Sequence, residues 1–323
     1  MSDSEEKLDT ESKEREEQLE KPLIEDVSAD VAPVVQEFIT EATEANDAEE
    51  ESASEESAFQ AGAGFAAAAF ASEKVAPYIS FENVYKSFGD FVVLEDVSFF
   101  VNPGETVCIL GRSGVGKSVA LRILMGFLKP DSGTVLVAGQ NIAGLSEREM
   151  QEVRRKVTMV FQNGALFDSI TVGENVAFPL RERGDMEEDQ ILQVVKGLLE
   201  MVGVAGMENM LPSDLSTGMK RSVAIARALA AQPMAVLYDE PTTMVDPLMG
   251  HLLGDLIQRL KMQMHLTSIV VTHDTRFAEK LADRLVFLHE STVRFFGTTE
   301  EMRASNDTVL REFFSMDELV LPV

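Results

Sequence analysis

Short apolar runs separated by polar turns begin near residue 78 and predict an antiparallel β piece. Three of these runs have the length and spacing of strands, at residues 78–84, 91–94 and 97–101. The turns Phe88-Gly89-Asp90 and Pro103-Gly104 interrupt or follow them. We therefore expect neighbouring antiparallel strands at the start of the folded part of the chain.

A second pattern follows, in which buried strands alternate with amphipathic helices. The apolar runs at 106–110, 157–161, 235–237 and 268–272 predict strands, and residues 118–126, 186–201 and 221–231 have helical spacing. This alternation predicts an α/β fold with a mostly parallel sheet, in which residues 165–230 form a mostly helical insertion. Ligands of such sheets bind beyond the carboxyl ends of the strands.

Residues 1–74 have a different composition, rich in Glu, Ser and Ala and poor in aromatic residues. Such a segment buries too little apolar surface to offset the entropy of ordering it. Residues 1–60 also contain 21 of the 55 acidic residues and 4 of the 28 basic ones, so most of the net charge of −27 lies there. We expect a disordered or loosely helical acidic tail at 1–74, a folded domain at 75–300 and a C-terminal extension at 301–323.

Charge and composition exclude several classes of protein. The folded part is also net negative and has no block of basic residues, which argues against a nucleic-acid partner. The only cysteine, Cys108, lies in an apolar run and is expected to be a buried thiol. No apolar stretch reaches the roughly 18 residues that a membrane-spanning helix needs, so we expect a soluble protein.

The strongest motif lies between the strand at 106–110 and the helix at 118–126. It matches the phosphate-binding pattern G-x-x-x-x-G-K-[ST] with Gly111, Arg112, Ser113, Gly114, Val115, Gly116, Lys117 and Ser118. Backbone N–H groups of such a loop and the N-terminus of its helix bind phosphates. Lys117 is expected to reach the β and γ phosphates and Ser118 to ligate Mg²⁺. The motif predicts that ATP binds here with Mg²⁺.

Two carboxylates follow the apolar run that begins at residue 235. Asp239 is placed to face the metal and Glu240 to polarise water. Read alone, the pair is ambiguous, since apolar runs that end in acidic residues are common at strand ends. About 120 residues after a phosphate loop, the pair is the expected metal-side strand of a P-loop NTPase.

The order of the remaining motifs narrows the class. They are Phe161-Gln162, Leu215-Ser216-Thr217-Gly218-Met219-Lys220, Asp239-Glu240, Thr243-Met244-Val245-Asp246 and Thr272-His273-Asp274. Read alone, Ser216 is an ordinary helix N-cap. In this order, however, the chain resembles an ABC-type ATPase over residues 78–297. The resemblance implies a RecA-like P-loop NTPase fold.

The resemblance also implies a role at each matching position. Phe88 would stack on adenine where Tyr is more usual, with packing in its own turn as the alternative. Glu240 would be the catalytic base and His273 would hold the γ-phosphate. The other implied positions are Lys117 in catalysis, Gln162 at Mg²⁺ and at the link to a transmembrane partner, Ser118 and Asp239 at the metal, Ser216 and Gly218 at the opposite subunit's ATP, and Asp246 at the dimer interface.

Two positions depart from the family pattern. Thr217 stands where the signature Leu-Ser-Gly-Gly-Gln has a glycine, so that a Cβ lies where backbone approaches phosphate. Met244 stands at the glycine of the usual Gly-Leu-Asp loop. Either change could slow hydrolysis or alter closure of the dimer, but neither removes a charged catalytic group.

The resemblance extends to the working assembly. An ABC site needs the phosphate loop of one subunit and the signature of another, which implies a homodimer. The stretch from Phe161 to Leu180, together with Met219, is similar to ATP-binding subunits of MCE-associated, Mla-type phospholipid transporters. That similarity implies a multi-span permease and an MCE-type lipid-binding protein as partners. It also implies a peripheral location at the cytoplasmic face of the inner membrane.

Three alternatives stay open. The first is an ABC transporter ATPase for a small solute, with the same catalytic residues. The second is a soluble ABC ATPase acting on DNA or ribosomes, which would show long heptad arms or duplicated cassettes that this chain lacks. The third is a switch that binds ATP without turnover; Glu240 and His273 argue against it, whereas Thr217 and Met244 favour it.

Overall fold

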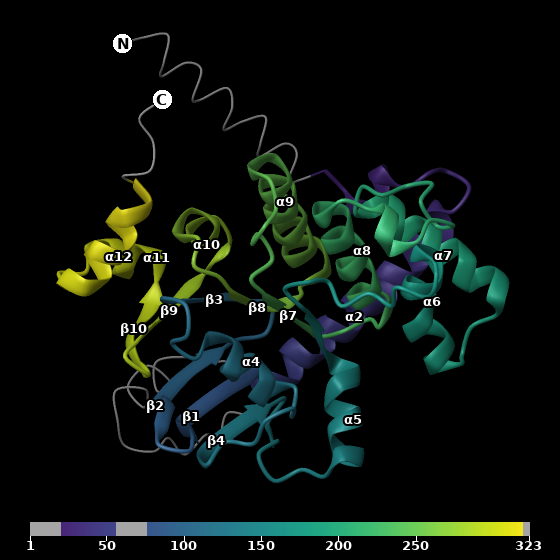
Figure 1. Ribbon diagram of the computed structural model, residues 1–323. Coiled ribbons are helices and arrows are strands. Elements are labelled where there is room, and N and C mark those ends of the chain that lie inside the picture. The colour runs from purple at the N-terminus through teal and green to yellow at the C-terminus, as the bar shows by residue number, and fades with distance from the viewer. Residues whose placement is uncertain (1–20, 56–75, 319–323) are drawn as a thin grey trace, which may run out of the picture.

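The computed structural model describes residues 21–55 and 76–318, whose strands form two sheets (Figure 1). The strands are β1 (Ile79–Phe88), β2 (Phe91–Val101), β3 (Thr106–Leu110), β4 (Ser132–Val137), β5 (Gln140–Asn141), β6 (Val157–Val160), β7 (Ala235–Asp239), β8 (Thr267–Val271), β9 (Arg284–His289) and β10 (Thr292–Thr298). The larger sheet has the order β10-β9-β3-β8-β7-β6 and is parallel except for the pair β9-β10. The smaller sheet, β2-β1-β4-β5, is antiparallel. The predicted α/β class is confirmed.

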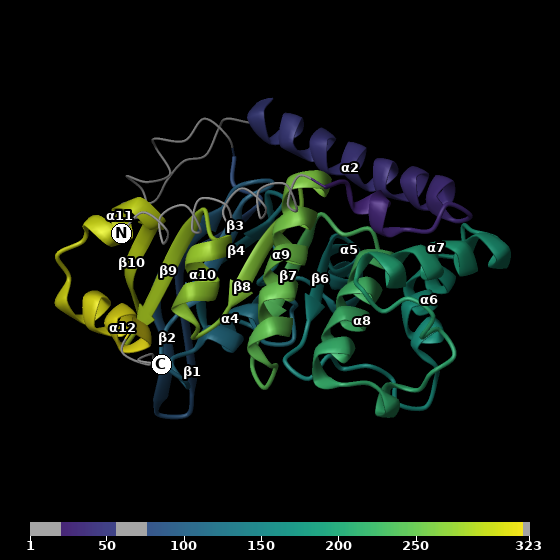
Figure 2. The ribbon, with the colours of Figure 1, turned by 90° about the horizontal axis from the view of Figure 1, so that it is seen from above.

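Both faces of the larger sheet are buried, as Figure 2 shows from above. The helices are α2 (Ala32–Glu55), α4 (Lys117–Leu124), α5 (Glu147–Lys156), α6 (Val172–Arg183), α7 (Glu188–Met201), α8 (Thr217–Ala230), α9 (Pro247–Met264), α10 (Thr275–Leu281), α11 (Thr299–Ala304) and α12 (Thr308–Glu318), with 3-10 turns η1 (Leu23–Asp26) and η2 (Pro212–Asp214). Successive side chains of a strand point to opposite faces. Cys108 and Leu110 therefore join the core beneath α6 to α10, whereas Val107 and Ile109 join the core beneath α4, α5 and the smaller sheet.

The antiparallel piece differs from the sequence prediction in its strand count. β2 is one continuous strand where the pattern predicted two, at 91–94 and 97–101. The apparent break is an irregularity of pairing, where Asp96 has a left-handed φ of 52° and accepts a 2.6 Å hydrogen bond from Asn83. Bulged residues interrupt the alternation of side chains without ending a strand. The sequence pattern also gave no prediction for β4, β5, β9 and β10.

The tail was expected to be disordered or loosely helical, and over residues 21–55 it is instead an ordered, largely helical segment that packs on the core. We call this segment the N-terminal strap; it consists of η1 and α2 and crosses α7 and α9 (Figure 2). Its buried apolar side chains are Leu23, Val27, Val31, Val35, Phe38, Ile39 and Ala42. They recur at helical spacing, so an acidic chain still presents one apolar stripe to the core. Residues 1–20 and 56–75 lie outside the described part.

Polar contacts fix the strap to both helices. The backbone N–H and hydroxyl of Ser28 donate to the Glu200 carboxylate of α7 at 2.6 and 2.9 Å. On α9, Arg259 pairs with Asp26 at 2.7 Å. The strap therefore joins the helical insertion to a helix that packs on the parallel sheet.

The strap packs tightly against a glycine of α7. A Cβ built on Gly197 would lie 2.0 Å from Cγ2 of Val35, whose side chain is fully buried. Glycine lowers helix stability by about 1 kcal/mol relative to alanine. At this position the lower stability is accompanied by space for the Val35 side chain. The absence of a side chain at Gly197 therefore allows the strap to pack closely on α7.

We predict coupled effects of Gly197→Ala and Val35→Ala on the free energy of unfolding. The first should destabilise the chain by about 1–3 kcal/mol through overpacking, and the second by about 2 kcal/mol through the lost methyl groups. In the double variant the new methyl group fills the space left by Val35, so the cost should fall at least ~1 kcal/mol below the sum. Denaturant unfolding without nucleotide measures all four chains.

Gly250→Ala is the matched control for this cycle. A Cβ at Gly250 of α9 would meet only the Thr242 methyl group at 3.7 Å, so alanine there should be neutral or stabilising. Additive costs for the Gly197 and Val35 changes would contradict the packing of the strap on α7.

The C-terminal extension packs on its own chain in the described residues. Leu310 of α12 is buried, and the Phe313 ring lies 4.9 Å from the ring of Phe287 in β9. Arg294 of β10 pairs with Asp307 at 2.9 Å, just before α12 begins. The apolar side chains of α12 therefore pack against the larger sheet at β9.

Candidate functional site

The predicted phosphate loop connects the end of β3 to the start of α4. Gly111 has φ 151° and Gly116 has φ 109°, which side chains rarely adopt. A Cβ would also lie 2.5 Å from the Leu288 carbonyl oxygen at Gly111 and 2.7 Å from the Val93 carbonyl oxygen at Gly116. Glycine is therefore required at both ends, and the loop leads directly into a helix N-terminus that favours anions.

Lys117 is the cation of this loop. Its Nζ donates to the carbonyl oxygens of Gly111 at 2.7 Å and Arg112 at 3.2 Å, and lies 3.5 Å from Oε1 of Glu240. Burial lowers the pKa of the Lys117 ammonium group, and the Glu240 carboxylate opposes that shift. The side chain is 6% exposed, so its charge acts in a poorly solvated place.

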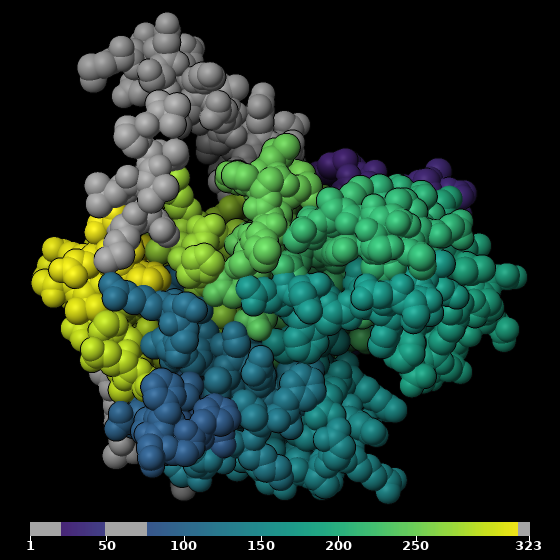
Figure 3. All heavy atoms as spheres, viewed as in Figure 1, coloured from purple at the N-terminus to yellow at the C-terminus, as the bar shows by residue number. Residues whose placement is uncertain are grey.

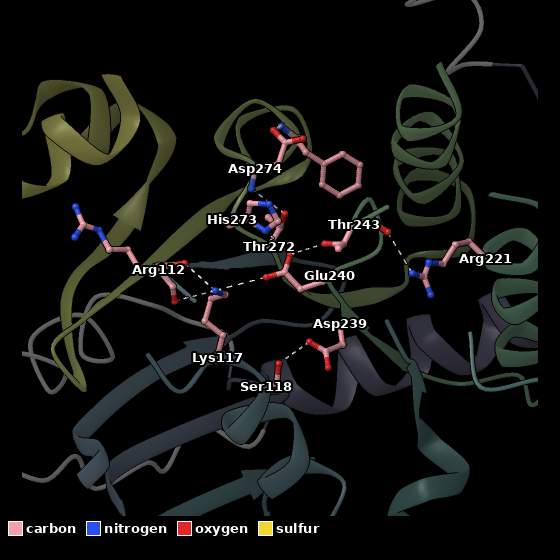
Figure 4. Close-up of polar contacts among 12 residues, drawn as sticks. Arg112, Lys117, Ser118, Arg221, Asp239, Glu240, Thr243, Thr272, His273 and Asp274 are labelled. Atoms are coloured by element: carbon pink, nitrogen blue, oxygen red, sulfur yellow. Dashed lines mark hydrogen bonds and ion pairs between the residues drawn. The ribbon is translucent and has the colours of Figure 1, made fainter. Parts of the chain in front are cut away.

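Ser118 and Asp239 form an oxygen pair at the next position. The Ser118 hydroxyl donates to Oδ1 of Asp239 at 2.8 Å (Figure 4). Burial at the end of β7 raises the pKa of Asp239, opposed by the hydrogen bond from Ser118. Mg²⁺ prefers a few protein oxygens and completes its shell with water and substrate phosphates, so this donor pair fits it. Within residues 21–55 and 76–318 no group of three or more His, Cys, Asp or Glu side chains gathers as a metal site.

Glu240 lies at the centre of a second cluster (Figure 4). Its Oε2 lies 2.7 Å from Nδ1 of His273 and accepts from the Thr243 hydroxyl at 3.2 Å. Glu240 has a left-handed φ of 50°, which costs energy for a residue with a side chain. The backbone N–H of Glu240 donates to the Val271 carbonyl oxygen at 2.9 Å, which holds this conformation at the ends of β7 and β8. The carboxylate is thus oriented by two neighbours and directed toward Lys117.

Most of the predicted residues line one cleft of about 780 Å³. From the predicted set it includes Phe88, Arg112, Ser113, Gly114, Gly116, Lys117, Ser118, Gln162, Glu240 and His273. Gln162 follows β6, where Nη1 of the buried Arg221 donates to the Phe161 carbonyl oxygen at 3.1 Å. The cleft therefore combines a phosphate loop, oxygen donors and an oriented carboxylate.

Six predicted residues do not line this cleft, and three of them, Gly111, Val115 and Asp239, still belong to the phosphate loop and to the end of β7 beside it. The other three lie on other elements. Ser216 is the N-cap of α8 and accepts from the N–H of Met219, and a Cβ on Gly218 would meet Met249. Neither Ser216 nor Gly218 lines the cleft. Asp246 is the N-cap of α9 and lines a neighbouring cleft of about 440 Å³ that His273 shares. One copy of the chain therefore does not bring its signature residues to its own phosphate loop.

Five residues that line the cleft were not predicted from the sequence: the aliphatic Val93 and Val119, and Thr243, Phe91 and Phe313. Thr243 was recognised as part of a motif, yet its contact with Glu240 was not predicted. Phe91 is the cross-strand partner of Phe88, a relation that the turn Phe88-Gly89-Asp90 could have indicated. Phe313 comes from α12, and the sequence around it carries no motif that relates it to the phosphate loop.

Residues 94–243 match the ABC transporter family. The chain is 41% identical over 256 residues to the Arabidopsis thaliana protein TRIGALACTOSYLDIACYLGLYCEROL 3, chloroplastic, covering 73% of this chain and 72% of that protein. It is 40% identical over 235 residues to the intermembrane phospholipid transport system ATP-binding protein MlaF of Haemophilus influenzae, covering 73% of this chain and 89% of that protein.

The fold is similar to that of solved ATP-binding cassettes. One is a dimeric post-hydrolysis state of the cassette MJ0796 bound to ADP and Pi, with a TM-score of 0.64 and 32% sequence identity. The match covers 68% of this chain and 98% of that one. Among the residues that the structure describes, no helix is both long and apolar enough to cross a bilayer.

Proposed function

Since this chain belongs to the family of ABC transporter ATP-binding proteins, we propose that it hydrolyses ATP to drive phospholipid transport between membranes. The observation that carries the substrate class is its 40% identity to a phospholipid-transport ATP-binding protein, 89% of whose length the match covers. The stretch from Phe161 to Leu180, which resembles the same group of transporters, supports it.

The geometry supports a role for each polar group around ATP. Backbone N–H groups of the loop and the Lys117 ammonium neutralise the β and γ phosphates, since phosphoryl transfer depends on positioning and charge. Ser118, Asp239 and Gln162 would hold Mg²⁺, which supplies further neutralisation of phosphate charge when bound. Glu240 orients the attacking water and accepts its proton, while His273 and Thr243 fix the direction of the carboxylate.

The separation of the signature from the loop supports a composite site. Ser216 and Gly218 lie at the N-terminus of α8, outside the cleft of their own chain. A second copy, related by a twofold axis, would bring that terminus to the γ-phosphate and form two equal sites. The dimeric state of the similar cassette MJ0796 supports this arrangement.

The structure also bears on the departure at Met244. Its backbone has a left-handed φ of 62°, and its side chain is 88% exposed. Glycine adopts this conformation without strain, which gives a physical reason for the glycine that the family usually has there. We infer that Met244, exposed two residues before Asp246, contacts the second copy and affects the rate of closure.

Partners and location follow from the same proposal. A multi-span permease would receive the motion of the dimer, and an MCE-type protein would carry lipid. The chain itself would bind peripherally at the cytoplasmic face of the inner membrane. The ordered helical insertion, α6 to α8, offers the surface next to Gln162 through which the motion reaches the permease.

The proposal predicts that a permease and bound phospholipid co-purify with the chain from its native membrane. Mass spectrometry of the extracted lipid identifies the phospholipid. When that complex is reconstituted in vesicles, transfer of a fluorescent phospholipid should require ATP. The same complex with Glu240→Gln is the matched control and should transfer none. Recovery of a solute-specific permease without phospholipid would contradict the lipid assignment and favour the small-solute alternative.

A further inference from the structure

The cleft above the phosphate loop is lined by two chemically different groups of residues. One group is the loop itself with the Lys117 ammonium, which suits phosphates. The other group is aromatic and consists of Phe88, Phe91 and Phe313. Figure 3 shows the C-terminal segment, in yellow, beside the blue surface of the early part of the folded chain. An occupant that is polyanionic at one end and aromatic at the other matches this division.

Phe88 and Phe91 come from the hairpin between β1 and β2. They are cross-strand partners and remain 49% and 66% exposed, which is unusual for two adjacent large apolar side chains. The hairpin is fixed beside the loop, because the Val93 carbonyl oxygen lies where Gly116 has no side chain. These two rings therefore form an exposed aromatic wall whose position relative to the phosphate loop is fixed.

Phe313 forms a second wall from a distant part of the sequence. Its ring packs at 4.9 Å against that of Phe287, whose strand position pairs with Leu110, the last residue before the phosphate loop. The helix that carries it is held by buried Leu310, whose N–H donates to Asp307 at 3.0 Å. Phe313 is thus supported from behind by the sheet while it lines the cleft.

We propose that Phe313 is a nucleobase-binding residue, which places one face of the adenine ring against the C-terminal extension. The inference rests on the proposed ATP-binding function and adds a residue outside the family motifs. Aromatic faces attract bases through stacking. Phenylalanine has no hydrogen-bonding atom, so this wall contacts the face of the base and does not distinguish adenine from guanine.

A ligand series separates base binding from phosphate binding. In the full-length chain with Mg²⁺, Phe313→Ala should raise the Kd of ADP and of GDP by about five- to thirtyfold, as loss of one stacking contact implies. Its Kd for inorganic triphosphate, measured by competition, should match that of the wild type. Phe313→Tyr should restore ADP affinity.

Phe314→Ala is the matched structural control. Phe314 contacts the Phe313 ring and the core but does not line the cleft, so its loss tests whether a disturbed α12 alone lowers affinity. We expect wild-type ADP binding for this variant. Equal losses with both alanine variants, or an equal loss of ADP and triphosphate affinity with Phe313→Ala, would overturn the assignment.

A spectroscopic test uses the absence of tryptophan from the chain. Phe313→Trp introduces a single fluorophore, whose emission should change when ADP binds and stay constant when inorganic triphosphate binds. Emission that ignores ADP while the variant still binds it would overturn the inference and leave ATP binding intact. A wild-type chain that bound neither ADP nor triphosphate would instead overturn the proposed function itself.

Discussion

The Glu240→Gln chain is expected to bind ATP with near wild-type affinity and to hydrolyse it about 100- to 1,000-fold more slowly. Glutamine keeps the size of the side chain and an oxygen that can accept from Thr243, whose hydroxyl lies 3.2 Å from Oε2. It removes the negative charge and the capacity to accept a proton from water. Phosphate release at saturating ATP and equilibrium ATP binding measure the two properties separately.

The same substitution should change the oligomeric state. If hydrolysis opens the dimer, a chain that binds ATP without turnover accumulates as closed dimers, which size-exclusion chromatography with ATP and Mg²⁺ detects. Glu152→Gln provides a matched change at a carboxylate of α5 that is 70% exposed and does not line the cleft. It should hydrolyse ATP at the wild-type rate. Undiminished steady-state hydrolysis by Glu240→Gln would show that Glu240 is not the catalytic base.

The phosphate loop could be predicted because its information is local. Glycines at positions such as Gly111 and Gly116 report directly on backbone conformations and close approaches that side chains forbid. The strand that ends at Asp239 could also be predicted, because residues 235–237 form a continuous apolar run, as in a strand buried on both faces, and the carboxylate follows at its end beside the site. In both places the residues that specify the fold also specify the chemistry.

The N-terminal strap shows where composition misled. Averaged over residues 1–74, acidic residues dominate, yet Val31, Val35, Phe38 and Ala42 recur on one helical face and are buried. The receiving surface is encoded more than 150 residues later, at Gly197, where a missing side chain leaves room for Val35. No local sequence pattern predicts packing between two residues this far apart in the chain.

Phe313 and Thr243 were missed for a related reason. Phe313 reaches the cleft because α12 folds back on β9, a tertiary contact that helical periodicity does not specify. Thr243 orients Glu240 only because Glu240 adopts a left-handed conformation at the end of β7. Both residues reach the site only through tertiary contacts, and neither lies in a local sequence pattern that predicts such contacts.

The composite site has consequences that can be tested with two inactive chains. Lys117→Ala removes the cation at the phosphates, and Ser216→Asp places a carboxylate at the γ-phosphate while keeping a good N-cap for α8. In a homodimer of either variant both sites carry one defect, so hydrolysis should fall at least ~100-fold. A heterodimer of the two carries both defects in one site and leaves the other site intact.

Hydrolysis by purified heterodimers, isolated through a different affinity tag on each chain, is the most direct measurement of the central claim. A shared site predicts that Lys117→Ala paired with Ser216→Asp recovers up to about half the wild-type rate. It also predicts that a chain carrying both changes, paired with a wild-type chain, stays inactive. The reverse outcome, an inactive first heterodimer and an active second one, would show that each chain hydrolyses ATP with its own Ser216 and would contradict the account.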